Sequence, residues 1–290
     1  MSEYDVIIVG NGPAGLSAAL YTSRANLSTL VIGKDQGALA KADRIENYFG
    51  MAEPVSGCEL VENTKCQVKS LGAELVTDEI FQISWNRGFL LTGRERNYQA
   101  KAVLLATGAS RKKADIKGLA GLEGRGVSYC AVCDAFFYRG RKVAVLGNED
   151  YAVHELNQLL PVAGQAVLLT NGLELHAEVP EGVPVIEKKI ASVDGEDMVE
   201  GVTFTDGSAE KLDGLFVALG SAGSADLARK VGALTDGRNI QTDETMATNV
   251  PGLYAAGDCT GGLLQISTAV GEGAKAAMSI IKFVRQQKKG

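Results

Sequence analysis

The start of the chain carries the strongest indication of its fold. Val6-Ile7-Ile8-Val9 is apolar and β-branched throughout, which is typical of a strand buried on both faces of a parallel sheet. The run leads directly into Gly10-Asn11-Gly12-Pro13-Ala14-Gly15, where Pro13 suits the first turn of a helix because its missing N–H is not needed there. A second apolar run follows at 29–32. The opening therefore predicts a βαβ unit.

The spacing of the glycines in this turn points to a ligand. Gly10, Gly12 and Gly15 follow the pattern G-x-G-x-x-G, and such glycines let backbone N–H groups approach a pyrophosphate at the positive end of the following helix. The position after a buried strand favours dinucleotide binding over the alternative, a tight structural turn. An acidic residue is expected after the second strand, but Gly33 stands there and Asp35 lies beyond it. Recognition of the ribose is therefore left open.

A weak internal repeat extends this pattern along the chain. Residues 6–10 are echoed by 143–147, and residues 104–108 by 216–220. Each half thus opens and closes with a strand that runs into glycine, which predicts two related α/β domains of the Rossmann-like, three-layer type. The strand at 253–256 resembles the first half more than the second. We therefore expect the second domain to be inserted into the first.

The domain boundaries follow from the polar stretches between these strands. The crossings are expected near 109–118 and 243–250, which carry the charged and turn-forming residues of linkers. The first domain would then cover residues 1–113 and 246–290, and the inserted domain 114–245.

Composition excludes several classes of protein. With 290 residues and 46% hydrophobic content, the chain can form about two globular domains. No apolar run approaches the roughly 20 residues of a membrane span, and the start lacks the basic flank of a signal peptide, so a cytoplasmic protein without a membrane partner is expected. The net charge of -6 argues against nucleic-acid binding.

Cys130-Ala131-Val132-Cys133-Asp134 is the second motif that carries chemistry. Two cysteines at this spacing can form a redox disulfide, supply half of a metal site or be an inert buried pair. A metal site needs further ligands, yet the other cysteines and both histidines are scattered singly, so no metal is expected and the redox disulfide is favoured. Asp134 is either an ordinary turn carboxylate or the proton donor that a thiolate leaving group needs.

In order and spacing, four motifs resemble the low-molecular-weight thioredoxin reductase family over nearly the whole chain. They are Gly10 to Gly15, Ala106-Thr107-Gly108, Gly126 to Asp134, and Ala255-Ala256-Gly257-Asp258 with Gln265 downstream. The resemblance implies a homodimer and FAD bound by the discontinuous first domain. The cofactor residues that it implies are Gly10, Gly12, Pro13, Ala14, Gly15, Asn47, Ala106, Thr107, Gly108, Gly257, Asp258 and Gln265.

The resemblance also implies the roles of the cysteines. In that family the pair takes electrons from the flavin and passes them to thioredoxin. By position, Cys133 would face the flavin, Cys130 would attack the partner disulfide and Asp134 would serve as the acid. The remaining cysteines, Cys58, Cys66 and Cys259, are expected to be small core residues.

The second half departs from the family where NADPH would bind. The turn reads Gly147-Asn148-Glu149-Asp150-Tyr151-Ala152, and its two carboxylates occupy the helix start that a pyrophosphate needs. After the next strand, 170–174 contains no arginine for a 2′-phosphate. The pattern is similar to the ferredoxin-linked flavin thioredoxin reductases, so the expected donor is ferredoxin.

Other interpretations stay open at this point. They are an NADPH-dependent thioredoxin reductase with a degenerate site, a disulfide oxidoreductase with FAD in both domains, and a flavin redox sensor without turnover. A basic face for an acidic ferredoxin is expected at Arg111-Lys112-Lys113 or Arg139-Gly140-Arg141-Lys142, although solvated charges at domain edges are an equal alternative. The C-terminal Arg285, Lys288 and Lys289 are interpreted as charges at a helix end.

Overall fold

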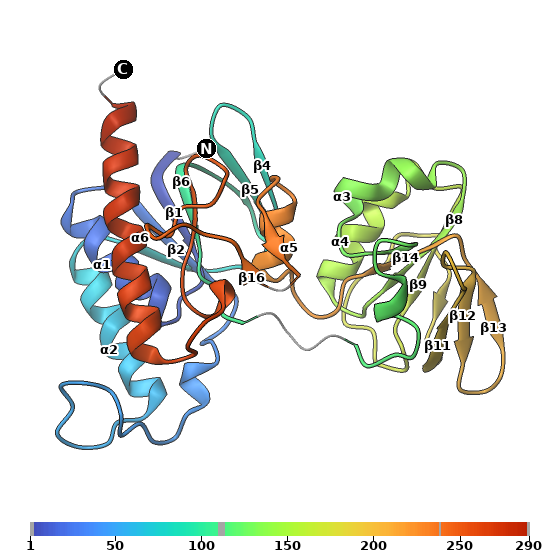
Figure 1. Ribbon diagram of the computed structural model, residues 1–290, viewed down its shortest axis with the longest axis horizontal. Helices are drawn as coiled ribbons and strands as arrows, with labels where there is room; N and C mark the ends of the chain where they lie inside the picture. Colours follow the sequence, from blue (N-terminus) through green and yellow to red (C-terminus); the bar gives the residue numbers. More distant parts are fainter. Residues whose placement is uncertain (1–2, 110–113, 238, 289–290) are drawn as a thin grey trace. The chain divides into compact units, whose positions relative to one another are not determined.

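The computed structural model describes residues 3–109, 114–237 and 239–288. The chain forms two compact units: one combines Met1–Arg111 with Gly223–Gly290, and the other is Lys112–Ala222 (Figure 1). No helix in the described ranges is both long and apolar enough to cross a membrane.

A seven-stranded sheet forms the centre of the first unit. Its order is β3-β2-β1-β6-β5-β4, and β17 pairs with the last part of β6. The strands are β1 Glu3–Val9, β2 Thr29–Gly33, β3 Glu74–Thr77, β4 Ile80–Trp85, β5 Phe89–Gly93, β6 Asn97–Leu105 and β17 Leu253–Ala255. Strands β1, β2, β3, β6 and β17 run parallel, whereas β4 and β5 are antiparallel additions. Because Ile7 is paired with both Leu30 and Val103, β1 lies in the interior of the sheet, as its apolar sequence predicts.

Three helices cover this sheet: α1 Pro13–Arg24, α2 Gly57–Ser70 and α6 Ile266–Gln287 (Figure 1). Their apolar residues share one core with Val6, Ile8 and Leu104 of the sheet. A Cβ atom on Gly273 would lie 2.1 Å from the carbonyl oxygen of Ala14, so α6 approaches the start of α1 through a glycine. Two short helices, η1 Leu39–Lys41 and η4 Asp258–Thr260, also belong to this unit.

The chain returns to the first unit earlier than 246. Helix α5 Ser224–Arg229 and the hairpin β15 Thr235–Asp236 with β16 Asn239–Ile240 contact β4 and η4 of the first unit. Lys230 Nζ donates to the carbonyl of Phe81 at 2.8 Å, which ties the end of this helix to β4. The expected second crossing near 243–250 therefore differs from the observed unit boundary at Ala222. The polar composition of 243–250 reflects surface turns instead.

The second unit contains a five-stranded parallel sheet of order β10-β9-β8-β14-β7 and a three-stranded antiparallel sheet of order β11-β12-β13. The parallel strands are β7 Val127–Ser128, β8 Lys142–Leu146, β9 Gln165–Leu169, β10 Val185–Ile186 and β14 Gly214–Val217. The antiparallel strands are β11 Ile190–Asp194, β12 Gly201–Phe204 and β13 Ala209–Lys211. The helices are η2 Ala120–Leu122, α3 Ala131–Asp134, η3 Ala135–Tyr138 and α4 Asp150–Leu159.

The two units share one structural device. A Cβ atom on Gly10 would lie 2.1 Å from the carbonyl oxygen of Ala106, and one on Gly147 would lie 2.2 Å from that of Ala218. In each unit a glycine after an interior strand thus lets the chain pass close to the end of the neighbouring parallel strand. The predicted α/β fold with two Rossmann-like domains is confirmed.

Candidate functional site

The glycine-rich turn joins the end of β1 to the start of α1, and its glycines differ in surroundings. Gly10 has φ +120° and, like Gly15, no room for a side chain, since a Cβ atom on Gly15 would lie 1.9 Å from the carbonyl oxygen of Gly10. Around Gly12 no described atom lies within 4 Å of such a Cβ. Gly10 and Gly15 are therefore required by packing, whereas the surface at Gly12 is open to a ligand.

The start of α1 is suited to an anion. Gly12 is the N-cap, Pro13 is the first residue, and within the described chain neither a side-chain cap nor a first-turn acidic residue occupies this end. The N–H groups of Ala14 and Gly15 belong to the first turn, where amides have no partner within the helix. An uncapped, positively polarised helix end beside an open glycine fits the pyrophosphate of a dinucleotide.

Three strand ends converge on this turn. A Cβ atom on Gly257, which follows β17 with φ +81°, would lie 2.9 Å from the Cβ of Ala14. Thr107, after β6, donates its N–H to Ser224 Oγ at 3.3 Å, and the two hydroxyls also contact each other. Glu272 Oε2 accepts from Gly257 N at 2.7 Å. The carboxyl ends of β1, β6 and β17 thus bring the three motifs of the first unit to one place.

Asn47 and Gln265 also meet. Asn47 Nδ2 donates to Gln265 Oε1 at 3.2 Å although 218 positions separate them, and both residues are exposed. The two amides that the resemblance places near the flavin are thus neighbours.

The structure explains why glycine, and not the expected acidic residue, stands at the end of β2. A Cβ atom on Gly33 would lie 2.2 Å from Asn11 Nδ2, and that same atom donates to the carbonyl of Asp35 at 2.8 Å. Asp35 itself accepts from Gly37 N at 2.7 Å. The side chain of Asn11 therefore occupies the space that a residue with a side chain would need at position 33.

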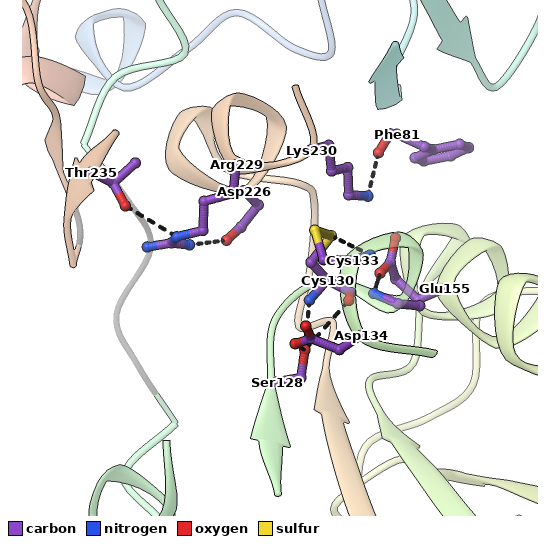
Figure 2. The surroundings of a disulfide bond; sticks show 11 residues. Phe81, Ser128, Cys130, Cys133, Asp134, Glu155, Asp226, Arg229, Lys230 and Thr235 are labelled. Carbon is purple, nitrogen blue, oxygen red and sulfur yellow. Dashed lines mark hydrogen bonds and ion pairs between the residues drawn. A yellow bond between two sulfur atoms is a disulfide. The ribbon is translucent and has the colours of Figure 1, made fainter. Parts of the chain in front are cut away.

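The cysteine pair of the second unit is a disulfide. Cys130 and Cys133 are bonded, with their Cα atoms 5.3 Å apart (Figure 2). In the described part of the chain, no group of three or more His, Cys, Asp or Glu side chains is arranged to hold a metal ion.

The other three cysteines are free thiols. The expectation of core residues is wrong for Cys58 and Cys66, which are exposed because α2 buries the side that carries Val61 and Val68. Cys259 is buried, and burial raises the pKa of its thiol to about 12. At neutral pH this thiol stays protonated.

The two sulfur atoms of the disulfide have different environments. Cys130 is 4% exposed and is the N-cap of α3, whereas Cys133 is exposed. Cys133 donates its backbone N–H to Cys130 Sγ at 3.2 Å. An N–H at a helix start that points to a sulfur stabilises its thiolate, so Cys130 is the sulfur better prepared to act as a nucleophile.

Asp134 is linked to the cysteines through Ser128, a residue that the sequence analysis did not single out. Ser128 Oγ donates to Asp134 Oδ2 at 2.6 Å and accepts from Cys130 N at 3.1 Å (Figure 2). Asp134 N in turn donates to the carbonyl of Cys130 at 3.2 Å. The half-buried carboxyl group is therefore held at the base of the cysteine loop.

The helix start after β8 contrasts with that after β1. Glu149 is the N-cap of α4 and Asp150 lies in its first turn. Asn148 is buried, donates from Nδ2 to the carbonyl of Glu174 at 2.8 Å, and accepts at its own carbonyl from His176 N at 2.8 Å. The segment after β9 is thus bonded to the turn, and two carboxylates occupy the helix end that would face a phosphate.

Contacts with neighbouring side chains reduce the positive charge available at the expected basic faces. Arg111, Lys112 and Lys113 lie outside the described residues. Lys142 forms an ion pair with Glu210, and the guanidinium of Arg139 lies 5.4 Å from the ring centre of Phe136. Arg141 is exposed.

At the C-terminus, Lys288 pairs with Asp5 at 3.0 Å and Arg285 lies in the last turn of α6. These two residues have the helix-end positions expected of them, and Lys289 lies outside the described residues.

Comparisons with known proteins agree with this geometry. Residues 4–273 match the family Pyridine nucleotide-disulphide oxidoreductase. The thioredoxin reductase of Aquifex aeolicus is 36% identical over 309 residues, covering 99% of this chain and 95% of that protein. The crystal structure of the atypical thioredoxin reductase TRi from Desulfovibrio vulgaris Hildenborough is similar with a TM-score of 0.92 and 41% identity, covering 97% of this chain and 98% of that one. A ferredoxin-flavin thioredoxin reductase from Clostridium acetobutylicum is similar with a TM-score of 0.71 and 31% identity, covering 97% of each chain.

Proposed function

The chain belongs to the thioredoxin reductase family of FAD-binding disulfide oxidoreductases, and from that premise we propose that it passes electrons from FAD through Cys130 and Cys133 to a thioredoxin-like protein. The observation that carries the proposal is the disulfide at the start of α3, with one sulfur exposed and the other bonded to a backbone N–H. Beside it lies the carboxyl group of Asp134, held by Ser128.

We assign the cofactor to the convergence of β1, β6 and β17. The backbone N–H groups of Gly12 and Ala14 would donate to the pyrophosphate beside Pro13, which has no N–H, at a helix start that carries no carboxylate. The remaining proposed contacts are Gly10, Gly15, Ala106, Thr107, Gly108, Gly257 and Asp258, with the Asn47 and Gln265 amides toward the flavin. When bound, FAD supplies the two electrons that open the disulfide.

The thiol steps follow from the two cysteine environments. Reduction of the disulfide consumes two electrons and two protons and leaves two thiols, with Cys133 as the sulfur that the electrons reach first. The Cys130 thiol then loses its proton to solvent, and the thiolate attacks the partner disulfide, forming a mixed disulfide and releasing one partner thiolate. Cys133 attacks Cys130 to reform the internal disulfide and releases the second partner thiolate. Asp134 donates a proton to a departing thiolate.

The surface beside the disulfide suits a protein substrate. Phe136 and Phe137 are each 70% exposed, and Val132, between the cysteines, is 43% exposed. Exposed aromatic side chains next to a reactive group are typical of a protein docking surface, since they bury apolar area on association. We infer that this patch, Val132 with Phe136 and Phe137, contacts the thioredoxin-like partner.

Single-turnover thiol counting tests the disulfide function. The holoprotein, photoreduced without oxygen, is mixed with oxidised thioredoxin, and we expect two new thiols on thioredoxin for each protein chain. Cys130→Ser and Cys133→Ser should each abolish this transfer, while Cys58→Ser, at an exposed position of α2, should not. Full transfer by Cys130→Ser would refute the assignment.

We infer that the donor is a ferredoxin rather than a nicotinamide nucleotide. Glu149 and Asp150 at the α4 start repel a pyrophosphate, and the bonds from Asn148 to the segment after β9 hold that segment against the turn. The relative from Clostridium acetobutylicum is named for its ferredoxin link. Anaerobic flavin bleaching by NADPH, NADH and reduced ferredoxin, measured side by side, tests this. We expect bleaching by ferredoxin alone, whereas rapid bleaching by NADPH would identify a nicotinamide-dependent enzyme and leave the disulfide chemistry standing.

The homodimer implied by the resemblance stays a prediction. Sedimentation equilibrium of the holoprotein measures it directly, and a monomer at micromolar concentration would contradict it.

A further inference from the structure

A buried carboxylate contacts the start of α3, the helix that contains Cys133. The thiol chemistry described above does not use this carboxylate. Glu155, on α4, is 1% exposed, and its Oε2 accepts the backbone N–H of Ala131 at 2.7 Å (Figure 2). Ala131 directly follows Cys130 and is the first residue of α3. The sequence spacing gave no sign of this contact, because 24 positions separate the two residues.

The contact affects the charge balance at Cys130. The N–H groups at the start of α3 are the donors that can stabilise a thiolate on the N-cap sulfur. Cys133 N points to Cys130 Sγ, but Ala131 N is bonded to the carboxylate of Glu155. Glu155 therefore accepts the N–H of Ala131, one of these donors. When ionised, it places a negative charge at the backbone N–H of the residue next to Cys130. In a buried environment such a charge disfavours a second negative charge nearby.

The consequence concerns only the reduced pair. The disulfide carries no charge, so a carboxylate beside it changes the free energy of the disulfide little. When Cys130 of the reduced pair is deprotonated, the carboxylate destabilises its thiolate. A less stable reduced state gives up its electrons more readily, so the pair becomes a stronger reductant. Conversely, stabilising the reduced form makes a disulfide a stronger oxidant.

We propose that Glu155 is a positioning residue that makes the Cys130/Cys133 pair a stronger reductant, by holding Ala131 N and by opposing thiolate formation at Cys130. The proposal deepens the proposed function and rests on the redox activity of this pair. It applies to the second unit alone, because Glu155, Ala131 and both cysteines belong to it.

The test is the thiol–disulfide equilibrium of the holoprotein with dithiothreitol. In this reaction dithiothreitol gives two electrons and two protons to the disulfide and becomes a cyclic disulfide. Exposed Cys58 and Cys66 are first replaced by serine, and the reduced fraction is read from the mass of the alkylated peptide that contains Cys130 and Cys133. The readout requires neither thioredoxin nor turnover.

Glu155→Gln keeps an oxygen that can accept from Ala131 N and removes the charge. At pH 9 we expect its equilibrium constant to shift toward the dithiol by about tenfold, which corresponds to about 30 mV for a two-electron couple. At pH 6 the shift should be smaller than at pH 9, because a smaller fraction of the dithiol state then carries a thiolate in either protein. The rate of Cys130 alkylation should also show a lowered thiol pKa.

Two further variants separate charge from structure. Glu178→Gln removes an exposed carboxylate from the same unit and should leave the equilibrium unchanged. If Glu155→Gln does not fold, Glu155→Met supplies an uncharged side chain of similar length, with the same shift expected. An unchanged equilibrium, an opposite shift, or an equal shift at both pH values would overturn the proposal. Failure of the proposed function would instead appear as no electron transfer from the wild-type dithiol to thioredoxin.

Discussion

At the scale of single residues, a comparison of equivalent positions in the two units distinguishes glycines required by packing from a glycine proposed to bind a ligand. Gly10 and Gly147 both follow an interior strand and both pass close to a neighbouring carbonyl oxygen, so each is required by its own fold. The next glycine of the motif is retained as Gly12 in the first unit and replaced by Glu149 in the second. No described atom lies within 4 Å of a Cβ atom on Gly12, so a side chain at this position need not disturb the strand and helix around it.

Gly12→Asp tests this separation. The substitution adds a carboxylate where no described atom lies within 4 Å, so we expect the protein to fold but to lose FAD. FAD content is measured by the flavin absorbance of the purified protein, and the fold by circular dichroism. Gly121→Asp, at an open glycine of the other unit, is the matched control and should remain yellow. Full FAD occupancy in Gly12→Asp would refute the placement of the pyrophosphate.

Asp134→Asn tests the proposed acid. The amide oxygen can still accept from Ser128 Oγ, so the loop should keep its shape while the proton donor is lost. We expect FAD binding to be unchanged and thiol exchange with thioredoxin to slow by roughly 10²-fold. Stopped-flow measurement with the reduced protein gives the rate, and Ser128→Ala, which keeps the carboxyl group, should lose less. An unaltered rate across pH would leave Asp134 with a structural role only.

At the scale of elements, what the sequence predicted depended on local periodicity. The buried strands at 6–9 and 143–146 and the helix after Gly12 were foreseen because β-branched runs, glycine spacing and Pro13 act within a few residues. Ser128, Glu155, Ser224 and Glu272 were missed. Their roles arise from contacts between elements, such as Glu155 of α4 with Ala131 of α3, and no local spacing encodes such a pair.

The contact between α1 and α6 gives a prediction about stability. Gly273→Ala adds a Cβ atom 2.1 Å from the carbonyl oxygen of Ala14, so the helices must separate, and we expect a loss of about 1–3 kcal/mol in unfolding free energy. Gly271→Ala lies on the same helix with no described atom within 4 Å, and it should be neutral or stabilising because alanine favours a helix. Urea unfolding of the two variants measures both effects. Equal stability would contradict the tight approach of the helices.

At the scale of the whole molecule, charge bears on the choice of donor. The chain has a net charge of -6, which on average repels an acidic ferredoxin, so a ferredoxin reaction needs a local basic surface. Arg139, Arg141 and Lys142 are close together in the sequence and form a candidate basic surface. Pairing of Lys142 with Glu210 removes much of its effect, and Arg139 contacts Phe136 of the docking patch proposed for thioredoxin. Arg141 is therefore the position at which the two partner reactions can be tested separately.

Charge reversal at Arg141 and at Arg139 should distinguish the reaction with ferredoxin from the reaction with thioredoxin. Arg141→Glu is expected to slow flavin reduction by ferredoxin by roughly threefold at low ionic strength, and the difference should disappear at high salt because exposed charges are screened. Electrons from photoreduced flavin should still reach thioredoxin at the wild-type rate. Arg139→Glu should slow both reactions, since it changes the charge and also the support of Phe136. Reversal at exposed Lys211 provides the control for net charge alone. Equal slowing by Lys211→Glu and Arg141→Glu would show that total charge, not a local surface, governs the encounter.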